Sequence, residues 1–367
     1  MPPERRRAVA ARERARAPEA EDAALSLAAR QRVGPPTIDD VAQRAGVSVA
    51  TVSRIINKKA FNKASADTID RVERAVAELN YRPMRAGRAL RTLESHLVAF
   101  LIPDITNAFY SAIAHSVEIA IRDLGYAMIL CNTEESPELQ DAYLDEMQSH
   151  LVRAVLLLGA VDSPGLRRAA ATGVPIVYLN RKAPPGLSGP FIGIDNAAAG
   201  RAVAEHFIRQ GYRRCSAIHG PLGSSASRER FEGYRSRLEA AGLALEADDV
   251  QAGTLTIESG YGAAVALLSG RTRPRAIFCG NDLMAYGAFR RCRELGLKVP
   301  GDIALFGFDD NPLNEWLATW LSTIHVPHDR FGPAASRVLR ALGGADSADA
   351  ASAHILLPFR PVFRESA

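Results

Sequence analysis

The stretch Thr37–Asn57 reads TIDDVAQRAGVSVATVSRIIN and has the pattern of two short helices separated by a tight turn. Thr37 followed by Asp40 is a typical helix start, because a side-chain oxygen can accept a hydrogen bond from an otherwise unpaired backbone N–H. Gly46 can adopt the left-handed conformation that ends a helix, and Ser48 can begin the next one. Apolar residues at helical spacing on either side of Gly46 give each helix a face to bury. The stretch therefore predicts a helix-turn-helix.

The exposed face of the second predicted helix carries the functional signal. Val49, Ala50 and Arg54 fall together there, because residues four apart lie one turn apart on a helix. Short hydroxyl and amide side chains surround them, with no acidic residue among them: Ser48, Thr51, Ser53 and Asn57. Hydroxyls can donate to phosphate oxygens, and an arginine can donate to O6 and N7 of guanine. This face predicts contact with nucleic acid; the alternative is an ordinary helical hairpin of an α-helical core.

Length and composition set the broad class. A chain of 367 residues is long enough for two or three domains, and 47% hydrophobic with 23% charged residues is typical of a soluble globular protein. Apolar runs such as 97–102 are as long as a strand and shorter than the roughly 18 residues of a membrane span. The four cysteines lie far apart without metal-ligand spacing: Cys131, Cys215, Cys279 and Cys292. We expect buried free thiols in the cytoplasm, with no metal site, no disulfide framework and no cofactor.

Charge is distributed unevenly along the chain. Residues 1–33 carry 8 basic and 5 acidic side chains, residues 34–95 carry 11 and 7, and the remaining 272 carry 26 and 29. A basic front on a mildly acidic body is typical of a polyanion-binding head attached to a module that does not itself bind nucleic acid. Residues 1–34 lack the apolar core of a secretory signal, so we expect a disordered basic tail and no export.

A third helix and a basic segment are expected after the pair. Ser65 can cap that helix, and its apolar stripe can close a three-helix core in a domain spanning 35–81. Residues 82–95 form the next segment, which is basic and contains Gly87 and Leu90. We expect it to form a hinge helix only on DNA, with Leu90 inserted into the minor groove; the alternative is a solvated linker.

The rest of the chain, 96–367, alternates apolar strand-length runs with helical stretches in two consecutive series. The runs include LVAFLIP (97–103), AVLLLG (154–159), PIVYLN (175–180), RCSAIHG (214–220), AIFCG (276–280) and IALFGFD (303–309). Two such series predict an α/β body of two lobes, each a parallel sheet with helices on both faces. We expect the lobes at about 96–195 plus 326–350, and 196–325 plus the C-terminal strand. The cleft between them is the natural pocket, because ligands bind beyond the carboxyl ends of such strands.

Several separated motifs resemble the lactose-repressor/galactose-repressor (LacI/GalR) family of bacterial transcription regulators. They are DVAQRAGVSVATVSRIIN, LNYRPMRAGRAL, IPDITNAFY, GPLGSSASRERFEGY, GNDLMAYG, IALFGFDD and LPFRPVFRES, and together they extend over about residues 36–366. The resemblance implies a homodimer whose heads bind near-palindromic operator DNA, in most cases a repressor. It also implies a body like the periplasmic sugar-binding proteins, with a small effector such as a sugar or sugar acid in its cleft. The residues after Arg364 lack an apolar heptad pattern, which favours a dimer over a coiled-coil tetramer.

The resemblance also implies contacts, position by position. Val49, Ala50 and Arg54 match base-reading residues, and Leu90 matches the leucine inserted at the operator centre. The matches to residues that contact the DNA backbone are Thr37, Ser48, Thr51, Ser53, Asn57 and Tyr81. The matches to effector contacts are Phe109, Tyr110, Asn180, Arg181, Ser224, Arg230, Asn281, Asp309 and Trp316. Two positions depart from the family pattern, because Met84 stands where asparagine is common and Gly87 where alanine is usual.

The chemistry of Asp309 and Arg230 agrees with an effector site. Asp309 ends an apolar strand, so its carboxylate can accept from two sugar hydroxyls, and Arg230 follows a Gly/Ser loop and can grip a hydroxyl or carboxylate. The structural alternatives are a turn cap for Asp309 and a surface ion pair for Arg230.

Two other classes of protein compete with this interpretation. An enzyme is disfavoured, because the sequence has no phosphate-binding loop with its lysine, no zinc-helix motif, no nucleophile elbow and no catalytic constellation. A sugar-binding receptor or transport protein without a DNA role would suit the body alone. The basic helical head favours the DNA-binding regulator.

Overall fold

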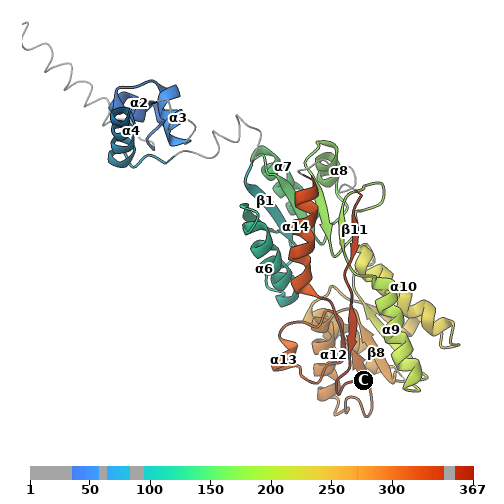
Figure 1. The fold of residues 1–367 in the computed structure, drawn as a ribbon. Helices are drawn as coiled ribbons and strands as arrows, with labels where there is room; N and C mark the ends of the chain where they lie inside the picture. Colours follow the sequence, from blue (N-terminus) through green and yellow to red (C-terminus); the bar gives the residue numbers. More distant parts are fainter. Residues whose placement is uncertain (1–34, 58–63, 83–94, 271, 343–351) are drawn as a thin grey trace, which may run out of the picture. The chain divides into compact units, whose positions relative to one another are not determined.

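The structure, a computed structural model, describes residues 35–57, 64–82, 95–270, 272–342 and 352–367. Contacts divide the chain into two units, with the boundary between Arg88 and Ala89 (Figure 1). The expectations for the tail and for the hinge residues Met84, Gly87 and Leu90 lie outside the described residues.

The first unit contains the three predicted helices. They are α2 (Ile38–Ala45), α3 (Val49–Ile56) and α4 (Ala66–Glu78). Thr37 and Asp40 form a capping box at the start of α2, and Gly46 ends that helix with φ 64°. Ser48 caps α3 and Ser65 caps α4, each by accepting from the backbone N–H three residues on. A small apolar core joins the helices: Val41, Ala42, Ala45, Val52, Ile55, Val72 and Ala75. The predicted helix-turn-helix is confirmed.

The first lobe of the second unit is a six-stranded parallel sheet in the order β11-β5-β4-β3-β1-β2. Its strands are β1 (Leu97–Ile102), β2 (Ala127–Asn132), β3 (Ala154–Leu158), β4 (Ile176–Leu179), β5 (Phe191–Gly193) and β11 (His354–Leu356). Alternate residues of β1 face opposite sides of the sheet, as strand geometry requires. Its Phe100 packs in the core that contains α6 (Ala108–Arg122) and α14 (Phe331–Leu342). Its Leu101 packs in the core that contains α7 (Pro137–Ser149) and α8 (Pro164–Ala171).

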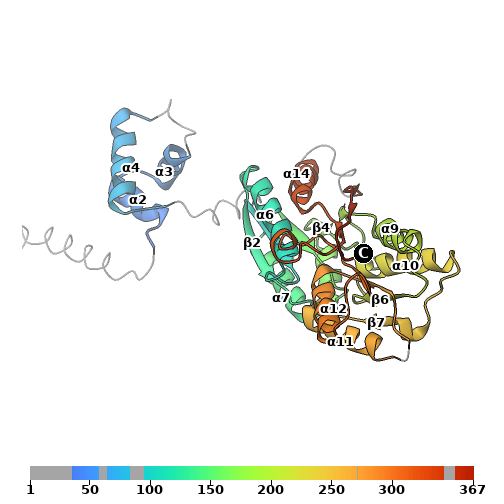
Figure 2. The same ribbon diagram turned by 90° about the horizontal axis from the view of Figure 1, so that it is seen from below.

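The second lobe is a four-stranded parallel sheet in the order β7-β6-β8-β9. Its strands are β6 (Cys215–His219), β7 (Val250–Ala252), β8 (Ala276–Cys279) and β9 (Ala304–Phe306). The helices α9 (Asn196–Arg209) and α10 (Ser225–Glu239) lie on one side of the sheet, and α11 (Ile257–Ser269) and α12 (Asp282–Glu294) on the other (Figure 2). The predicted α/β body of two parallel-sheet lobes is confirmed.

The chain passes between the lobes three times. The crossings follow β5, β10 (Thr323–His325) and β11. β10 pairs antiparallel with β12 (Arg360–Val362), α14 returns to pack on α6, and β11 adds an edge strand to the first sheet. Both lobes therefore contain segments from the C-terminal part of the chain.

A few elements differ from the sequence prediction. The sequence pattern predicts a helix at about 228–241, but α10 begins at Ser225, because the Ser224 hydroxyl caps it by accepting from Ser227 N–H. The sequence pattern does not predict several short elements, since three or four residues carry no periodicity. They are β5, β10, β11, α13 (Asn314–Leu317) and the 3₁₀ turns Ala247–Asp249 and His328–Arg330. All four cysteines are free and buried, as expected.

Candidate functional site

The exposed face of α3 presents the residues predicted to contact nucleic acid. Val52 and Ile55 are buried against the small core, while Val49, Ala50 and Arg54 are exposed on the other side. The Arg54 Nε donates to the carbonyl of Ala50 at 3.1 Å, which lays the guanidinium along the helix surface. Among the described residues, Arg54 pairs with its own helix backbone, and the guanidinium can exchange that bond for one to a base edge.

The residues predicted to contact the DNA backbone surround this face. Ser48 and Asn57 are exposed at the two ends of α3, and Thr51 and Ser53 are half-buried between them. Thr37 is exposed at the start of α2. Tyr81 is half-buried beyond α4, where burial and the negative charge of Asp39 raise its pKa. Leu90 lies outside the described residues.

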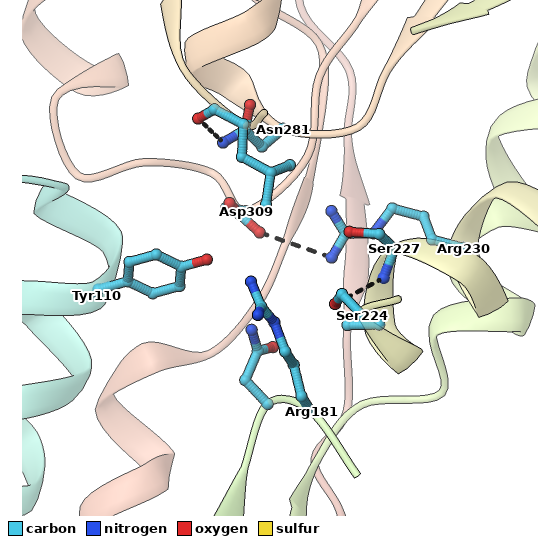
Figure 3. Close-up of a pocket in the computed structure, with 10 residues that line it drawn as sticks. Tyr110, Arg181, Ser224, Ser227, Arg230, Asn281 and Asp309 are labelled. Atoms are coloured by element: carbon cyan, nitrogen blue, oxygen red, sulfur yellow. Dashed lines mark hydrogen bonds and ion pairs between the residues drawn. The ribbon is translucent and has the colours of Figure 1, made fainter. Parts of the chain in front are cut away.

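A polar pocket lies at the carboxyl ends of the strands, between the two lobes (Figure 3). It encloses about 270 Å³ of space not filled by atoms, part of which is open to solvent. The residues that line it are Tyr110, Asn180, Arg181, Ser224, Ala226, Ser227, Arg230, Leu255, Asn281 and Asp309. The first lobe contributes the ends of α6 and β4, and the second contributes α10 and the ends of β8 and β9. A larger hollow lies between α6 and α14.

Arg230 reaches the pocket from α10 and is held by four groups. Its Nη2 donates to Asn196 Oδ1 at 3.1 Å, its Nη1 donates to the carbonyl of Gly280, and its guanidinium carbon lies 3.3 Å from the centre of the Phe308 ring. Its Nη2 lies 3.9 Å from Asp309 Oδ1, which is close enough for charge attraction and too far for a direct hydrogen bond. A ligand hydroxyl placed between these two groups could accept from the first and donate to the second.

Burial shifts both members of this pair toward their neutral forms. It raises the pKa of Asp309 to about 8, against the opposing effect of the Arg230 charge. It lowers the pKa of Arg230 to about 10, although Asp309 favours the charged form. A buried carboxyl with a strongly raised pKa in a cleft is a physical indication of a binding site.

Arg181 is the second buried guanidinium of the pocket, and its partner is a residue that the sequence did not suggest. Arg181 Nη1 donates to Glu135 Oε2 at 2.9 Å, and Nη2 donates to Glu135 Oε1. Nη1 also donates to the carbonyl of Gly159 at 3.3 Å. Burial alone would lower the pKa of Arg181, but the hydrogen bonds and charge of Glu135, together with Tyr110, outweigh it and hold the pKa above its usual value.

Tyr110 and Asn281 complete the polar lining. The Tyr110 hydroxyl points into the pocket from α6 (Figure 3), and burial raises its pKa to about 12, so it remains protonated and can donate. Asn281 caps α12 by accepting from Met284 N–H at 2.9 Å, and its Nδ2 donates to the carbonyl of Leu255 at 3.0 Å. The second Nδ2 hydrogen is the part of this side chain that could face a ligand.

Seven of the nine predicted effector contacts line the pocket, and two do not. Phe109 is buried in the core of the first lobe, because successive helical residues point in different directions and Tyr110 takes the pocket-facing position. Trp316 lies on the four-residue helix α13 with 81% of its surface exposed. The sequence interpretation missed Ala226, Ser227 and Leu255 in the lining, and Glu135 behind Arg181.

The described part of the chain contains no helix long and apolar enough to cross a membrane. Within the same residues, no group of three or more histidine, cysteine, aspartate or glutamate side chains is placed to hold a metal ion.

Two family models match the chain. Residues 37–84 match the model for bacterial regulatory proteins of the lacI family, and residues 204–367 match a periplasmic binding protein-like domain. The first match covers the helix-turn-helix, and the second covers most of the lobe that contains Arg230 and Asp309.

Individual proteins extend the match to most of the chain. The ribose operon repressor of Escherichia coli K12 is 35% identical over 305 residues, which are 83% of this chain and 92% of that protein. The HTH-type transcriptional repressor PurR of Proteus mirabilis is 33% identical over 307 residues, or 83% of this chain and 89% of that protein.

Solved structures agree with this relationship. The Lac repressor dimer bound to operator and the anti-inducer ONPF superimposes with a TM-score of 0.77 and 26% identity, covering 91% of this chain and 99% of that one. The complex of the transcriptional regulator CelR with cellobiose gives a TM-score of 0.68 and 30% identity, covering 90% and 100%. The exposed face of α3, the two-lobed body and these matches together place the chain in the lacI family of bacterial regulatory proteins, as a transcriptional regulator with a helix-turn-helix head and a periplasmic-binding-protein-like body.

Proposed function

We propose that the protein is a homodimeric, sequence-specific repressor that binds a near-palindromic operator and responds to a small polyhydroxylated effector. The convergence of seven predicted polar or aromatic contacts on one pocket, in a chain with an exposed DNA-reading helix, carries the proposal. Under this proposal the protein works in the cytoplasm and has no catalytic role.

The DNA half of the proposal assigns roles on α3. Val49, Ala50 and Arg54 read base edges, and the surrounding hydroxyl and amide groups hold the phosphates. Two heads in a dimer would read two half-sites related by symmetry, which accounts for a near-palindromic operator. Relatives of this chain are named as repressors, which supports repression over activation.

The effector half assigns the pocket to a sugar or sugar acid. Asp309 and Arg230 bind hydroxyls from the second lobe, while Tyr110, Asn180 and Arg181 bind from the first. A ligand that contacts both lobes stabilises one angle between them, and only such a difference in affinity between two states can shift an equilibrium. Because the relatives include ribose operon repressors, D-ribose is the first probe.

Two measurements test the DNA half of the proposal. Selection of binding sites from a random DNA library with the full-length protein should return a near-palindrome. Affinity for it should fall on the order of 10³-fold between about 50 and 200 mM salt, because released counterions dominate binding to phosphates. Failure to enrich any sequence would remove the regulator function and leave the alternative, a sugar-binding protein without a DNA role.

A further inference from the structure

Among the described residues, three cationic side chains at or next to the pocket are paired with carboxylates, and a fourth carboxylate, Asp282, is held by neutral donors. Arg181 pairs with Glu135, Arg230 faces Asp309 at 3.9 Å, and Lys182 at the rim pairs with Glu229 at 2.7 Å. Asp282 lies beneath Asp309, where its carboxylate accepts from the Thr323 hydroxyl at 2.6 Å and from Asn311 N–H at 2.7 Å. Each cation near the pocket therefore has its own carboxylate.

The ion pair at the Arg181 end of the pocket joins residues that follow two different strands. Arg181 follows β4, and Glu135 follows β2 at the far edge of the sheet, with the ends of β3 and β1 between them. Glu134 and Glu135 have φ angles of 54° and 58°, in the left-handed region that costs non-glycine residues energy. This turn directs the Glu135 carboxylate back over two strand ends onto the guanidinium. The Arg181 side chain is 4% exposed, so without this carboxylate its charge would be buried and unpaired.

Hydrogen-bonding chemistry restricts the ligand further. A sugar hydroxyl can both donate and accept a hydrogen bond. The pocket lining offers both kinds of partner, because it has guanidinium and amide donors and the Asp309 carboxylate as an acceptor. A ligand carboxylate that approached Arg181 closely would have to displace the Glu135 carboxylate or lie beside its like charge.

We propose that Glu135 determines the charge class of the effector, so that the pocket takes an uncharged monosaccharide and rejects the matching sugar acid. This inference rests on the proposed function, because it requires that the pocket hold the effector. Glu135 acts as a specificity-determining residue without lining the pocket itself. Its carboxylate neutralises the Arg181 charge and leaves other guanidinium hydrogens that can donate to a neutral hydroxyl.

The test compares matched neutral and acidic ligands on the full-length protein by calorimetric titration at pH 8.5, which lies above the Asp309 pKa of about 8. The pairs are D-ribose with D-ribonate, D-glucose with D-glucuronate, and D-galactose with D-galacturonate. For at least one pair the wild type should bind the neutral sugar and bind its acid roughly tenfold or more weakly.

Glu135→Gln keeps the size of the side chain and removes its charge. It should reduce or reverse this ratio by roughly tenfold in favour of the acid, because the Arg181 charge becomes available. Glu146→Gln is the matched control, since Glu146 pairs with His150 on an exposed face of the same lobe and should leave the ratio unchanged. Glu135→Asp keeps the charge and should retain the wild-type preference if Glu135→Gln fails to fold. The double variant Glu135→Gln/Arg181→Gln should restore the preference for the neutral sugar through loss of both charges.

Three results would overturn the inference. They are a wild type that prefers an acid, a ratio unaffected by Glu135→Gln, and a wild type that binds none of the three neutral sugars. Binding of the selected operator is measured in parallel on the same samples. If operator binding persists while the sugar result fails, the charge-class inference falls and the regulator function stands.

Discussion

Asp309 and Asp310 are adjacent in the chain, yet their carboxylates face different partners: Asp309 faces Arg230 in the pocket, and Asp310 pairs with Arg364 and His325. Both have positive φ angles, 100° and 51°, which favour glycine and are costly for aspartate. Asp309 N–H donates to the carbonyl of Ile324 at 3.0 Å, which ties the strained pair to β10. The ligand-facing carboxylate is therefore placed by contacts on the opposite side of the same turn.

Asp310→Asn should destabilise the protein by about 1–3 kcal/mol at pH 7, because it removes a half-buried charge that accepts from Arg364 at 2.9 Å and His325 at 3.0 Å. Burial would raise the pKa of Asp310, but these hydrogen bonds outweigh it and lower the pKa to about 2. A depressed pKa contributes stability above the unfolded value near 4, which is lost as pH falls toward 2. Urea titrations should thus show the variant approaching the wild type between pH 4 and about 2.

The control for this change is Asp162→Asn, because Asp162 pairs with Arg167 on the exposed surface. It should cost less than about 1 kcal/mol at any pH. Equal losses for the two variants would show that the Asp310 cluster contributes no more than a surface pair.

Asp309→Asn should have the opposite pH dependence in the ligand-free protein. Because burial raises the pKa of Asp309 to about 8, its contribution to stability is present below about pH 4 and is lost as pH rises through about 8. The variant cannot ionise at this position. Its stability relative to wild type should therefore increase between pH 5 and 8.5 in urea titrations, and a constant difference would show that Asp309 ionises normally.

Asp309→Asn should also separate effector response from DNA binding. The α3 face is unchanged, so affinity for the selected operator should stay within about twofold of wild type, while the ligand's influence on that affinity disappears. In the wild type this coupling is typically about 1–3 kcal/mol and is reciprocal, so operator DNA should shift ligand affinity by the same factor. Anisotropy titrations with both components check this, and a variant with a normal ligand response would remove Asp309 from the site.

Arg54→Ala should weaken operator binding by about 1–3 kcal/mol and relax the preference at one base pair in each half-site. The matched control is Arg74→Ala, because Arg74 is an exposed arginine of the same unit that pairs with Asp70 on α4. Repeating the site selection with each variant measures the change. Uniform weakening on all sequences would assign Arg54 to phosphate contact.

Gly200→Ala should displace the pocket residues of α10, although Gly200 itself does not line the pocket. A Cβ at Gly200 would lie 2.0 Å from the backbone oxygen of Arg230, so α10 would have to shift away from α9. We expect a loss of about 1–3 kcal/mol or more in stability, together with weaker sugar binding, because overpacking displaces backbone. Gly262→Ala is the control: it has open space around it on α11 and should gain up to about 1 kcal/mol in helix propensity.

The fold and most of the pocket could be predicted from the sequence because both depend on local patterns. The structure brings Asp309, at the end of an apolar strand, and Arg230, after a Gly/Ser loop, to one pocket, while their contact with an effector stays a prediction. Glu135 could not be found in this way, because its role depends on a turn that spans two strand ends. Trp316 is expected at the pocket because it is an aromatic residue that matches a family contact. It lies instead on the four-residue helix α13, which leaves its side chain exposed.

The three crossings between the lobes have a consequence for how the body can be cut. A lobe joined by one linker could be released by a single proteolytic cleavage, but here any one cleavage leaves two covalent connections. The same three connections restrict twisting of one lobe against the other and leave bending across them as the least costly motion. A nicked body should therefore remain a single particle that can still open and close around its ligand.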